Sequence, residues 1–189
     1  MKITSSKFIK GISGSDEILE HNFPQVAFIG RSNVGKSSLI NTLTNHKGLA
    51  ITSSFPGRTR EINLFLINNS TYLMDLPGYG FAKASHKTRE HLFRLINWYL
   101  FRSECKQKFV VLIIDAKVGP TKDDLEILKT LEDYGKNIVV VANKVDKIKK
   151  SEYQDQLQAI SEIIGNHEII PFSSETKVGI KELTRKILS

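Results

Sequence analysis

The chain has 189 residues, 40% of them hydrophobic and 25% charged, with a formal net charge of +7. That length suits a single domain, and the composition is typical of soluble globular proteins rather than disordered or collagenous chains. The longest apolar run, 109–116, contains Asp115 and stops short of the roughly 20 apolar residues that a membrane helix needs. We therefore expect one globular domain without a membrane span.

Features of both chain ends and the cysteine content favour the cytoplasm. The N-terminal segment carries Lys7, Lys10 and Asp16 where a secretory signal would need an unbroken apolar stretch. Cys105 is the only cysteine, so no disulfide can form within the chain, which suits a reducing compartment. The Leu-Ser end offers no prenylation signal. We expect a cytoplasmic monomer that does not bind membranes.

The first strand, loop and helix are predicted near residue 30. An apolar run at 26–29 ends in glycine, and apolar residues at helical spacing follow over 39–43. We place the domain at 25–189 and expect residues 1–24 to form an extension that packs on it. Next come two strand-like runs, 62–67 and 71–74, separated by three polar residues that suit the tight turn of an antiparallel hairpin.

The rest of the chain alternates short apolar runs with helical patterns. The runs 109–114, 138–142 and 168–172 are typical of strands buried on both faces. The predicted helices are 87–103, 122–134, 151–164 and 177–188. This order predicts an α/β fold with a six-stranded, mostly parallel sheet, one antiparallel strand and helices on both faces. In such folds, ligands bind where the carboxyl ends of the strands meet the loops.

A glycine-rich loop follows the first strand. Residues 30–37 match G-x-x-x-x-G-K-[ST] between a predicted strand and a predicted helix. Gly30 and Gly35 let the backbone wrap closely around phosphates, whose charge meets loop N–H groups and the positive end of the helix. Lys36 would reach the β- and γ-phosphates, and Ser37 would supply a hydroxyl to Mg²⁺. The loop predicts a nucleotide site.

A second motif, Asp75-Leu76-Pro77-Gly78, ends the neighbouring predicted strand. There Asp75 can hold a Mg²⁺-bound water, and the Gly78 N–H can reach the γ-phosphate. The polar loop 53–60 lies between the two motifs, and its Thr59 would reach the metal only when a γ-phosphate is present, as in a switch loop.

The third motif, Asn143-Lys144-Val145-Asp146, selects the base. The Asp146 carboxylate can accept paired hydrogen bonds from the ring N–H and the exocyclic amine of guanine, a pair that adenine cannot make. Sites built on such buried polar groups reject a mismatched ligand by up to about 10⁴-fold. Backbone N–H groups of Phe172, Ser173 and Ser174, after the last strand, would meet the base carbonyl.

The segment from Phe81 to Phe109 is basic and rich in aromatic residues. One interpretation is a surface that faces RNA, because basic residues attract polyphosphate backbones. The other is a solvated helix whose aromatic residues pack inward. Composition alone leaves both interpretations open.

Together the motifs GRSNVGKS, GRT, DLPG, NKVD and FSS resemble the translation-factor-like GTPases of the Era, EngA, YihA and septin superfamily. More narrowly, RSNVGKSSLIN, TSSFPGRT, DLPGYGFAK and FSSETKVGI resemble the bacterial EngB family, also called YihA or YsxC. The resemblance implies a single Ras-like P-loop GTPase domain that binds GTP and GDP with Mg²⁺. It also implies that the partner is the large ribosomal subunit or its precursor, that the protein acts in assembling it, and that normal cell division and septation need it.

The resemblance also carries residue roles onto this chain. Lys36, Thr59 and Gly78 would be catalytic, and Ser37 and Thr59 would hold the metal. The implied nucleotide-binding residues are Gly30, Arg31, Ser32, Asn33, Val34, Gly35, Lys36, Ser37, Ser38, Gly57, Arg58, Thr59, Arg60, Glu61, Asp75, Leu76, Pro77, Gly78, Asn143, Lys144, Val145, Asp146, Phe172, Ser173 and Ser174.

One position departs from the Ras pattern. Tyr79 stands where Ras-like enzymes place a glutamine that orients water, so we expect slow intrinsic hydrolysis, on the order of 10⁻⁴ per second as in unassisted Ras. Asn33 occupies the position of a potassium ligand in relatives that K⁺ activates, and K⁺ activation is a hypothesis. Arg58 and Arg60 could act as a finger in cis, although exposed basic loops more often meet RNA phosphate or solvent.

Two alternatives come from other functional classes. A P-loop nucleotide kinase would use the same loop, but it needs no guanine-selecting motif such as 143–146. A nucleotide-gated scaffold with little hydrolysis is supported by Tyr79. A Ras-like membrane signalling protein is disfavoured because no lipidation motif is visible.

Overall fold

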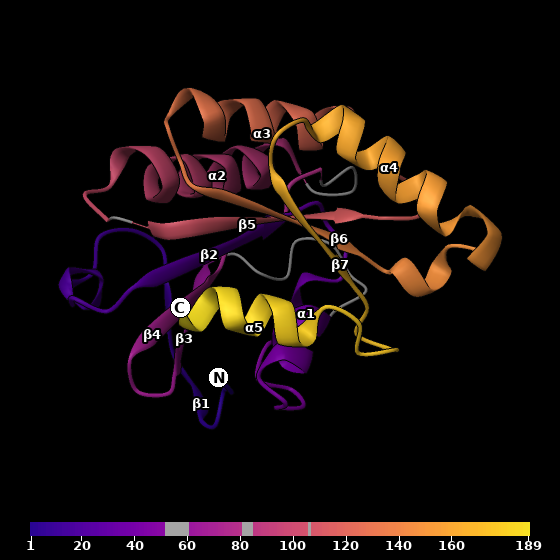
Figure 1. Cartoon of the computed structure of the whole chain (residues 1–189). Helices are drawn as coiled ribbons and strands as arrows, with labels where there is room; N and C mark the ends of the chain where they lie inside the picture. Colours follow the sequence, from indigo (N-terminus) through magenta and orange to yellow (C-terminus); the bar gives the residue numbers. More distant parts are fainter. Residues whose placement is uncertain (52–60, 81–84, 106) are drawn as a thin grey trace.

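A seven-stranded sheet forms the centre of the molecule, with helices on both faces (Figure 1). The computed structural model describes residues 1–51, 61–80, 85–105 and 107–189. The strands are β1 Ser6–Ile12, β2 Gln25–Gly30, β3 Ile62–Ile67, β4 Thr71–Asp75, β5 Gln107–Asp115, β6 Ile138–Asn143 and β7 Glu168–Phe172. Their order across the sheet is β1-β3-β4-β2-β5-β6-β7.

The strand directions confirm the predicted mostly parallel sheet. Strands β4, β2, β5, β6 and β7 pair in parallel, whereas β3 is antiparallel to both of its neighbours, β1 and β4. Among the described strands, β3 is therefore the one that runs against the others.

The expected number of strands was wrong by one, because residues 6–12 form the edge strand β1. A register shift between Phe8 and Lys10 interrupts its pairing with β3. Phe8 and Lys10 are exposed and Ile9 is half-buried. The bulge thus removes the regular alternation of apolar and polar residues that would have identified a strand. The boundary placed at residue 24 stays a prediction.

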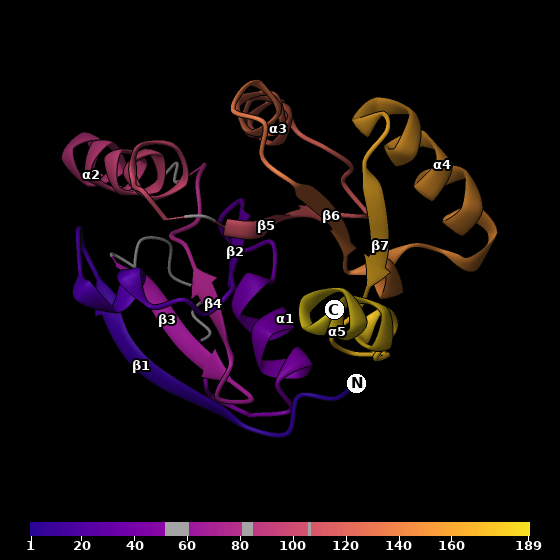
Figure 2. The same ribbon diagram turned by 60° about the vertical axis from the view of Figure 1, so that its left-hand side comes forward.

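In the described part of the chain, five α-helices cover the sheet. They are α1 Lys36–Leu43, α2 His86–Asn97, α3 Lys122–Asp133, α4 Tyr153–Ile164 and α5 Ile180–Leu188. Figure 2 shows α2, α3 and α4 on one face of the sheet and α1 and α5 on the other. None of the helices in the described part of the chain is both long and apolar enough to cross a membrane.

Three predicted helices differ from the observed ones by more than one residue at an end. The α-helix predicted over 87–103 ends at Asn97 as α2 and is followed by a π-helical turn, Trp98–Arg102. The helix predicted from Ser151 begins at Tyr153, after the 3-10 turn Lys150–Glu152. The last helix begins at Ile180 rather than Lys177, because Lys177 and Gly179 adopt left-handed backbone angles. A Cβ at position 179 would lie 2.1 Å from the Pro171 carbonyl oxygen, so this tight turn requires glycine.

Successive residues of the central strands belong to two different cores. In β2, Ala27 and Ile29 pack on the face of α2, α3 and α4, whereas Val26 and Phe28 pack on the face of α1 and α5. The same alternation continues in β5 and β6. Both faces are buried, which explains why these strands are apolar throughout. The sheet thereby holds the carboxyl ends of its parallel strands rigidly at one edge.

Candidate nucleotide-binding site

The glycine-rich loop turns directly from β2 into α1. Gly35 precedes the first helical residue with a left-handed φ of 98°, and a Cβ there would lie 2.5 Å from Asn143 Nδ2. Val34 is buried in the core below the loop. The loop is therefore held from beneath, and the N–H groups of the first turn of α1 are free of partners within the helix, as an anion site requires.

Lys36 and Asp75 form a buried ion pair between the first and second motifs. The Lys36 ammonium contacts Asp75 Oδ1, and the two residues are 8% and 1% exposed. Burial of either charge alone would be costly, so each stabilises the other. The Ser37 hydroxyl, one residue further, and the Asp75 carboxylate are hard oxygen donors of the kind Mg²⁺ prefers. This donor set fits a magnesium ion.

Backbone hydrogen bonds join the second motif to the glycine-rich loop. The Ser32 N–H donates to the Tyr79 carbonyl at 2.8 Å, and the Tyr79 N–H donates to the Gly30 carbonyl at 3.3 Å. A Cβ on Gly78 would lie 3.2 Å from Ser32 Cα. The structure thus brings the first two motifs into contact, as their positions at neighbouring strand ends predicted.

The third motif also contacts the loop. Asn143 Nδ2 donates to the Val34 carbonyl at 2.9 Å, and Lys144 Nζ donates to the Asn33 carbonyl at 2.9 Å and to Asp115 Oδ2 at 2.8 Å. Asn143 Oδ1 is buried and has no hydrogen-bond partner among the described atoms. Sequence reasoning missed Asp115, which only the pairing of β5 with β6 places opposite Asn143.

Asp146 is held by the segment after β7. The Ser173 hydroxyl donates to Asp146 Oδ1 at 2.6 Å, and Lys147 Nζ lies 3.5 Å from Oδ2. The Ser173 hydrogen bond, assisted by the Lys147 charge, lowers the pKa of Asp146. The Ser174 hydroxyl is buried and unpartnered among the described atoms. An ionised carboxylate is thus fixed in place where a base with two donors can bind it.

Of the predicted site residues 57–61, Gly57, Arg58, Thr59 and Arg60 lie outside the described residues. Glu61 lies at the end of β1: its Oε1 accepts a hydrogen bond from Ser13 Oγ, one residue beyond the strand, at 3.2 Å, and its side chain adjoins Gly11 of β1.

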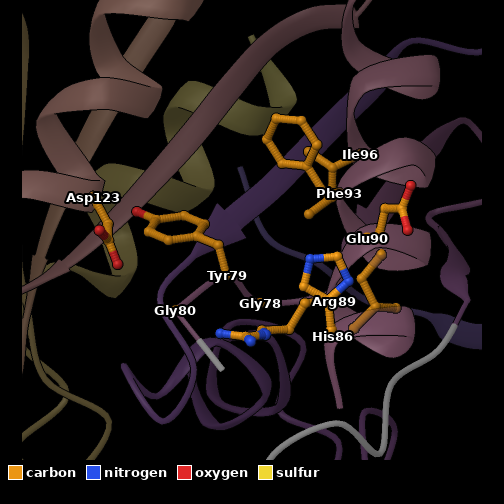
Figure 3. Close-up of a pocket in the computed structure, with 10 residues that line it drawn as sticks. Gly78, Tyr79, Gly80, His86, Arg89, Glu90, Phe93, Ile96 and Asp123 are labelled. Carbon is orange, nitrogen blue, oxygen red and sulfur yellow. The ribbon is translucent and has the colours of Figure 1, made fainter. Parts of the chain in front are cut away.

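The Tyr79 side chain points toward α3, where Asp123 lies (Figure 3). Its hydroxyl donates to Asp124 Oδ1 at 2.5 Å, and burial, followed by the nearby Asp124 charge, raises the pKa of Tyr79. Asp124 also caps α3, because its Oδ2 accepts from the Thr121 N–H at 2.8 Å. Sequence reasoning missed Asp124, although the T-x-x-D spacing is that of a capping box.

The fold and the three joined motifs define a P-loop GTPase. The sequence model of the 50S ribosome-binding GTPases matches residues 25–144, and that of the elongation factor Tu GTP-binding domain matches residues 101–189. The chain is 44% identical over 186 residues to the probable GTP-binding protein EngB of Clostridium perfringens, covering 97% of this chain and 94% of that one. It is 40% identical over 185 residues to the EngB of Bacillus subtilis, covering 96% and 94%. The chain belongs to the EngB family of GTP-binding proteins.

Solved structures agree with this assignment. A probable GTP-binding protein engB superimposes with a TM-score of 0.72 at 25% identity, covering 87% of this chain and 96% of that one. An Era variant from Aquifex aeolicus bound to GDP and AlF₄⁻ gives 0.74 at 28% identity, covering 89% and 56%. The predicted fold class and the resemblance to EngB are confirmed, and membership in a GTPase family argues against the kinase alternative.

Tyr79→Phe tests the contact between Tyr79 and Asp124. Removal of the hydroxyl leaves a buried carboxylate oxygen without its donor, which should destabilise the fold by about 1–3 kcal/mol. Basal GTP hydrolysis should stay within about twofold, since the ring faces α3. Urea denaturation and phosphate release measure the two effects. Tyr134→Phe, at an exposed tyrosine, is the control and should be neutral; a stable Tyr79→Phe would contradict the assigned contact.

Ser173→Ala tests what keeps Asp146 ionised. A lowered pKa means that the Asp146 charge contributes stability above the ordinary aspartate pKa of about 3.9, and that this contribution is lost as the pH falls through the lower folded value. Without the Ser173 hydroxyl the pKa of Asp146 should rise, so the loss should begin at higher pH. Carboxyl ¹³C NMR titration measures it. Ser174→Ala removes a hydroxyl that has no partner among the described residues and should leave the Asp146 titration unchanged; equal titration curves for both variants would exclude the Ser173 contact.

Proposed function

We propose that this chain is a slow GTPase that acts as a nucleotide switch in assembly of the large ribosomal subunit, and that normal cell division and septation depend on it. The observation that carries the proposal is the joining of three motifs at one sheet edge: Asn143 binds the Val34 carbonyl while Lys36 pairs with Asp75. Membership in the 50S ribosome-binding GTPases supports the ribosomal part.

In this proposal, the loops after β6 and β7 recognise guanine. The ionised Asp146 accepts hydrogen bonds from the ring N–H and the amine of guanine, while Ser173 fixes its orientation. Asn143 Oδ1 and Ser174 Oγ, which are buried and have no hydrogen-bond partner in the described part of the chain, support a polar ligand at this edge, because unpaired buried groups are costly.

The glycine-rich loop and Gly78 bind the phosphates in this proposal. Lys36 neutralises phosphate charge, and the Gly78 N–H donates to the terminal phosphate, contributions that act by positioning and electrostatics. Ser37, Asp75 through a bound water, and Thr59 would hold Mg²⁺, which offsets charge on the phosphates when bound. A solved complex of Era with MgGDPNP, at 28% identity, supports that metal.

Slow hydrolysis follows from the position of Tyr79. Its side chain is bonded to Asp124, so it does not orient a water at the phosphates. A partner or K⁺ near Asn33 would have to raise the rate, and K⁺ activation remains part of this proposal. The same observation favours a second candidate, a nucleotide-gated scaffold that hydrolyses little GTP.

Asp146→Asn tests base recognition. The amide can donate to the C2 carbonyl of xanthine but cannot accept both guanine donors, so GTP affinity should fall by at least about 100-fold while XTP affinity rises. Fluorescent nucleotide titration measures both affinities. Asp155→Asn, on the outer side of α4, is the matched control and should bind GTP normally. Unchanged GTP preference in Asp146→Asn would refute the assigned role.

Cosedimentation with purified large subunits tests the ribosomal role. We expect the GTP analogue to retain the chain on subunits more than GDP does, and phosphate release to be slow in Na⁺ and faster in K⁺. Guanine nucleotide binding without subunit binding would remove the ribosomal role and leave the GTPase assignment. Subunit binding without phosphate release would favour the scaffold.

A further inference from the structure

The outer face of α2 exposes one large aromatic side chain. Phe93 is 60% exposed, whereas its neighbours Leu92, Leu95 and Ile96 are buried. The other aromatic residues near this helix pack inward: Tyr99 is fully buried, and Trp98 and Phe101 are partly buried against the core. The inward-packing interpretation therefore holds for these three residues but not for Phe93.

Helix α2 carries exposed basic side chains besides Phe93. Lys87, Arg89 and Arg94 are exposed on the same helix, together with His86 and His91. Glu90, the one carboxylate on α2, lies 3.3 Å from Arg94. Lys87 and Arg89 have no carboxylate partner within the described part of the chain, so the helix presents excess positive charge.

A cavity of about 650 Å³ adjoins Phe93 (Figure 3). Phe93 and Ile96 on α2 line it, with Gly78, Tyr79 and Asp123 opposite. Groups of both charges also line the cavity, namely Glu90 and Asp123 together with Arg89 and His86. The two carboxylates can accept hydrogen bonds from the amino groups of a base, and the Arg89 guanidinium can hold a phosphate beside it.

We propose that the outer face of α2 docks single-stranded RNA, with a base stacked on Phe93 and flanking phosphates on Lys87 and Arg89. Aromatic side chains with adjacent cations are the usual means of holding unpaired nucleotides. A protein partner fits less well, because Phe93 is the only large hydrophobic residue exposed on the described α2. The inference deepens the proposed ribosomal role and rests on it.

The test measures anisotropy of a labelled 12-nucleotide RNA of mixed sequence, with the full chain and GDP, over a range of KCl concentrations. Phe93→Ala should weaken binding about tenfold and leave the salt dependence unchanged, because stacking is not ionic. The plot of log affinity against log salt has a negative slope. The double variant Lys87→Ala with Arg89→Ala should make that slope shallower by about 1.4, or about 0.7 per lost phosphate contact.

Matched controls lie elsewhere on the molecule. Ile163→Ala removes a residue of similar exposure, 54%, from α4, and Lys181→Ala with Arg185→Ala removes two exposed cations from α5. Both should bind RNA like the unmodified chain, and all variants should bind fluorescent GDP equally, which verifies folding. Equal losses in the controls, or full RNA binding by Phe93→Ala, would overturn the proposal.

Cosedimentation of the same variants with large subunits separates the two proposals. If RNA binding depends on Phe93 but the unmodified chain does not bind subunits, the α2 surface stands and the ribosomal role fails. If subunit binding needs Phe93 while the free RNA is not bound, the partner on this face is a protein and the RNA proposal is wrong.

Discussion

The buried ion pair of Lys36 with Asp75 is the constraint on which the site depends. Parallel pairing of β2 with β4 places the two side chains together, and neither charge can stay buried without the other. A phosphate that takes Lys36 leaves Asp75 without its cation, so phosphate binding alone is opposed by the cost of a bare buried carboxylate. Asp75 would regain a cationic partner if a divalent cation were bound together with the phosphate. The pair would therefore favour binding of nucleotide and metal together over either one alone.

At the end of the candidate site around Asp146, the polar groups are instead held in place by hydrogen bonds to one another. Ser173 donates to Asp146 and also accepts from the N–H groups of Glu175 and Thr176, at 3.2 and 3.1 Å. The Asn143 side-chain N–H donates to the Val34 carbonyl, and its Oδ1 has no partner in the part of the chain that the structure describes. Such preorganisation reduces the entropy that a ligand loses on binding. One end of the site is thus rigid, while the other must exchange an ion pair.

Sequence reasoning located the motifs because each one follows a strand whose apolar pattern is unmistakable, and parallel strands bring their carboxyl ends to one edge. It failed where the apolar pattern of a strand was irregular and where a contact joins residues far apart in the sequence. The bulge between Phe8 and Lys10 concealed β1, and the contact of Tyr79 with Asp124 joins positions 45 residues apart. Comparison with Ras-like enzymes, which have a glutamine at this position, identified Tyr79 as unusual. Only the fold shows that its ring faces α3. The loop containing Thr59 lies outside the described residues, so its assigned role stays a prediction.

The segment 78–80 connects the nucleotide site to the α2 surface. The backbone of Tyr79 pairs with Gly30 and Ser32, its hydroxyl binds α3, and residues 78–80 line the cavity beside Phe93. Gly80 has a left-handed φ of 72°, and a Cβ there would lie 3.0 Å from Arg31 Cγ and 3.2 Å from Asp123 Oδ2. One short segment thus forms a wall of both sites. If a γ-phosphate bound at Gly78 displaced this segment, the cavity beside α2 would change as well, and linkage would then require a ligand in that cavity to bias nucleotide binding by the same free energy.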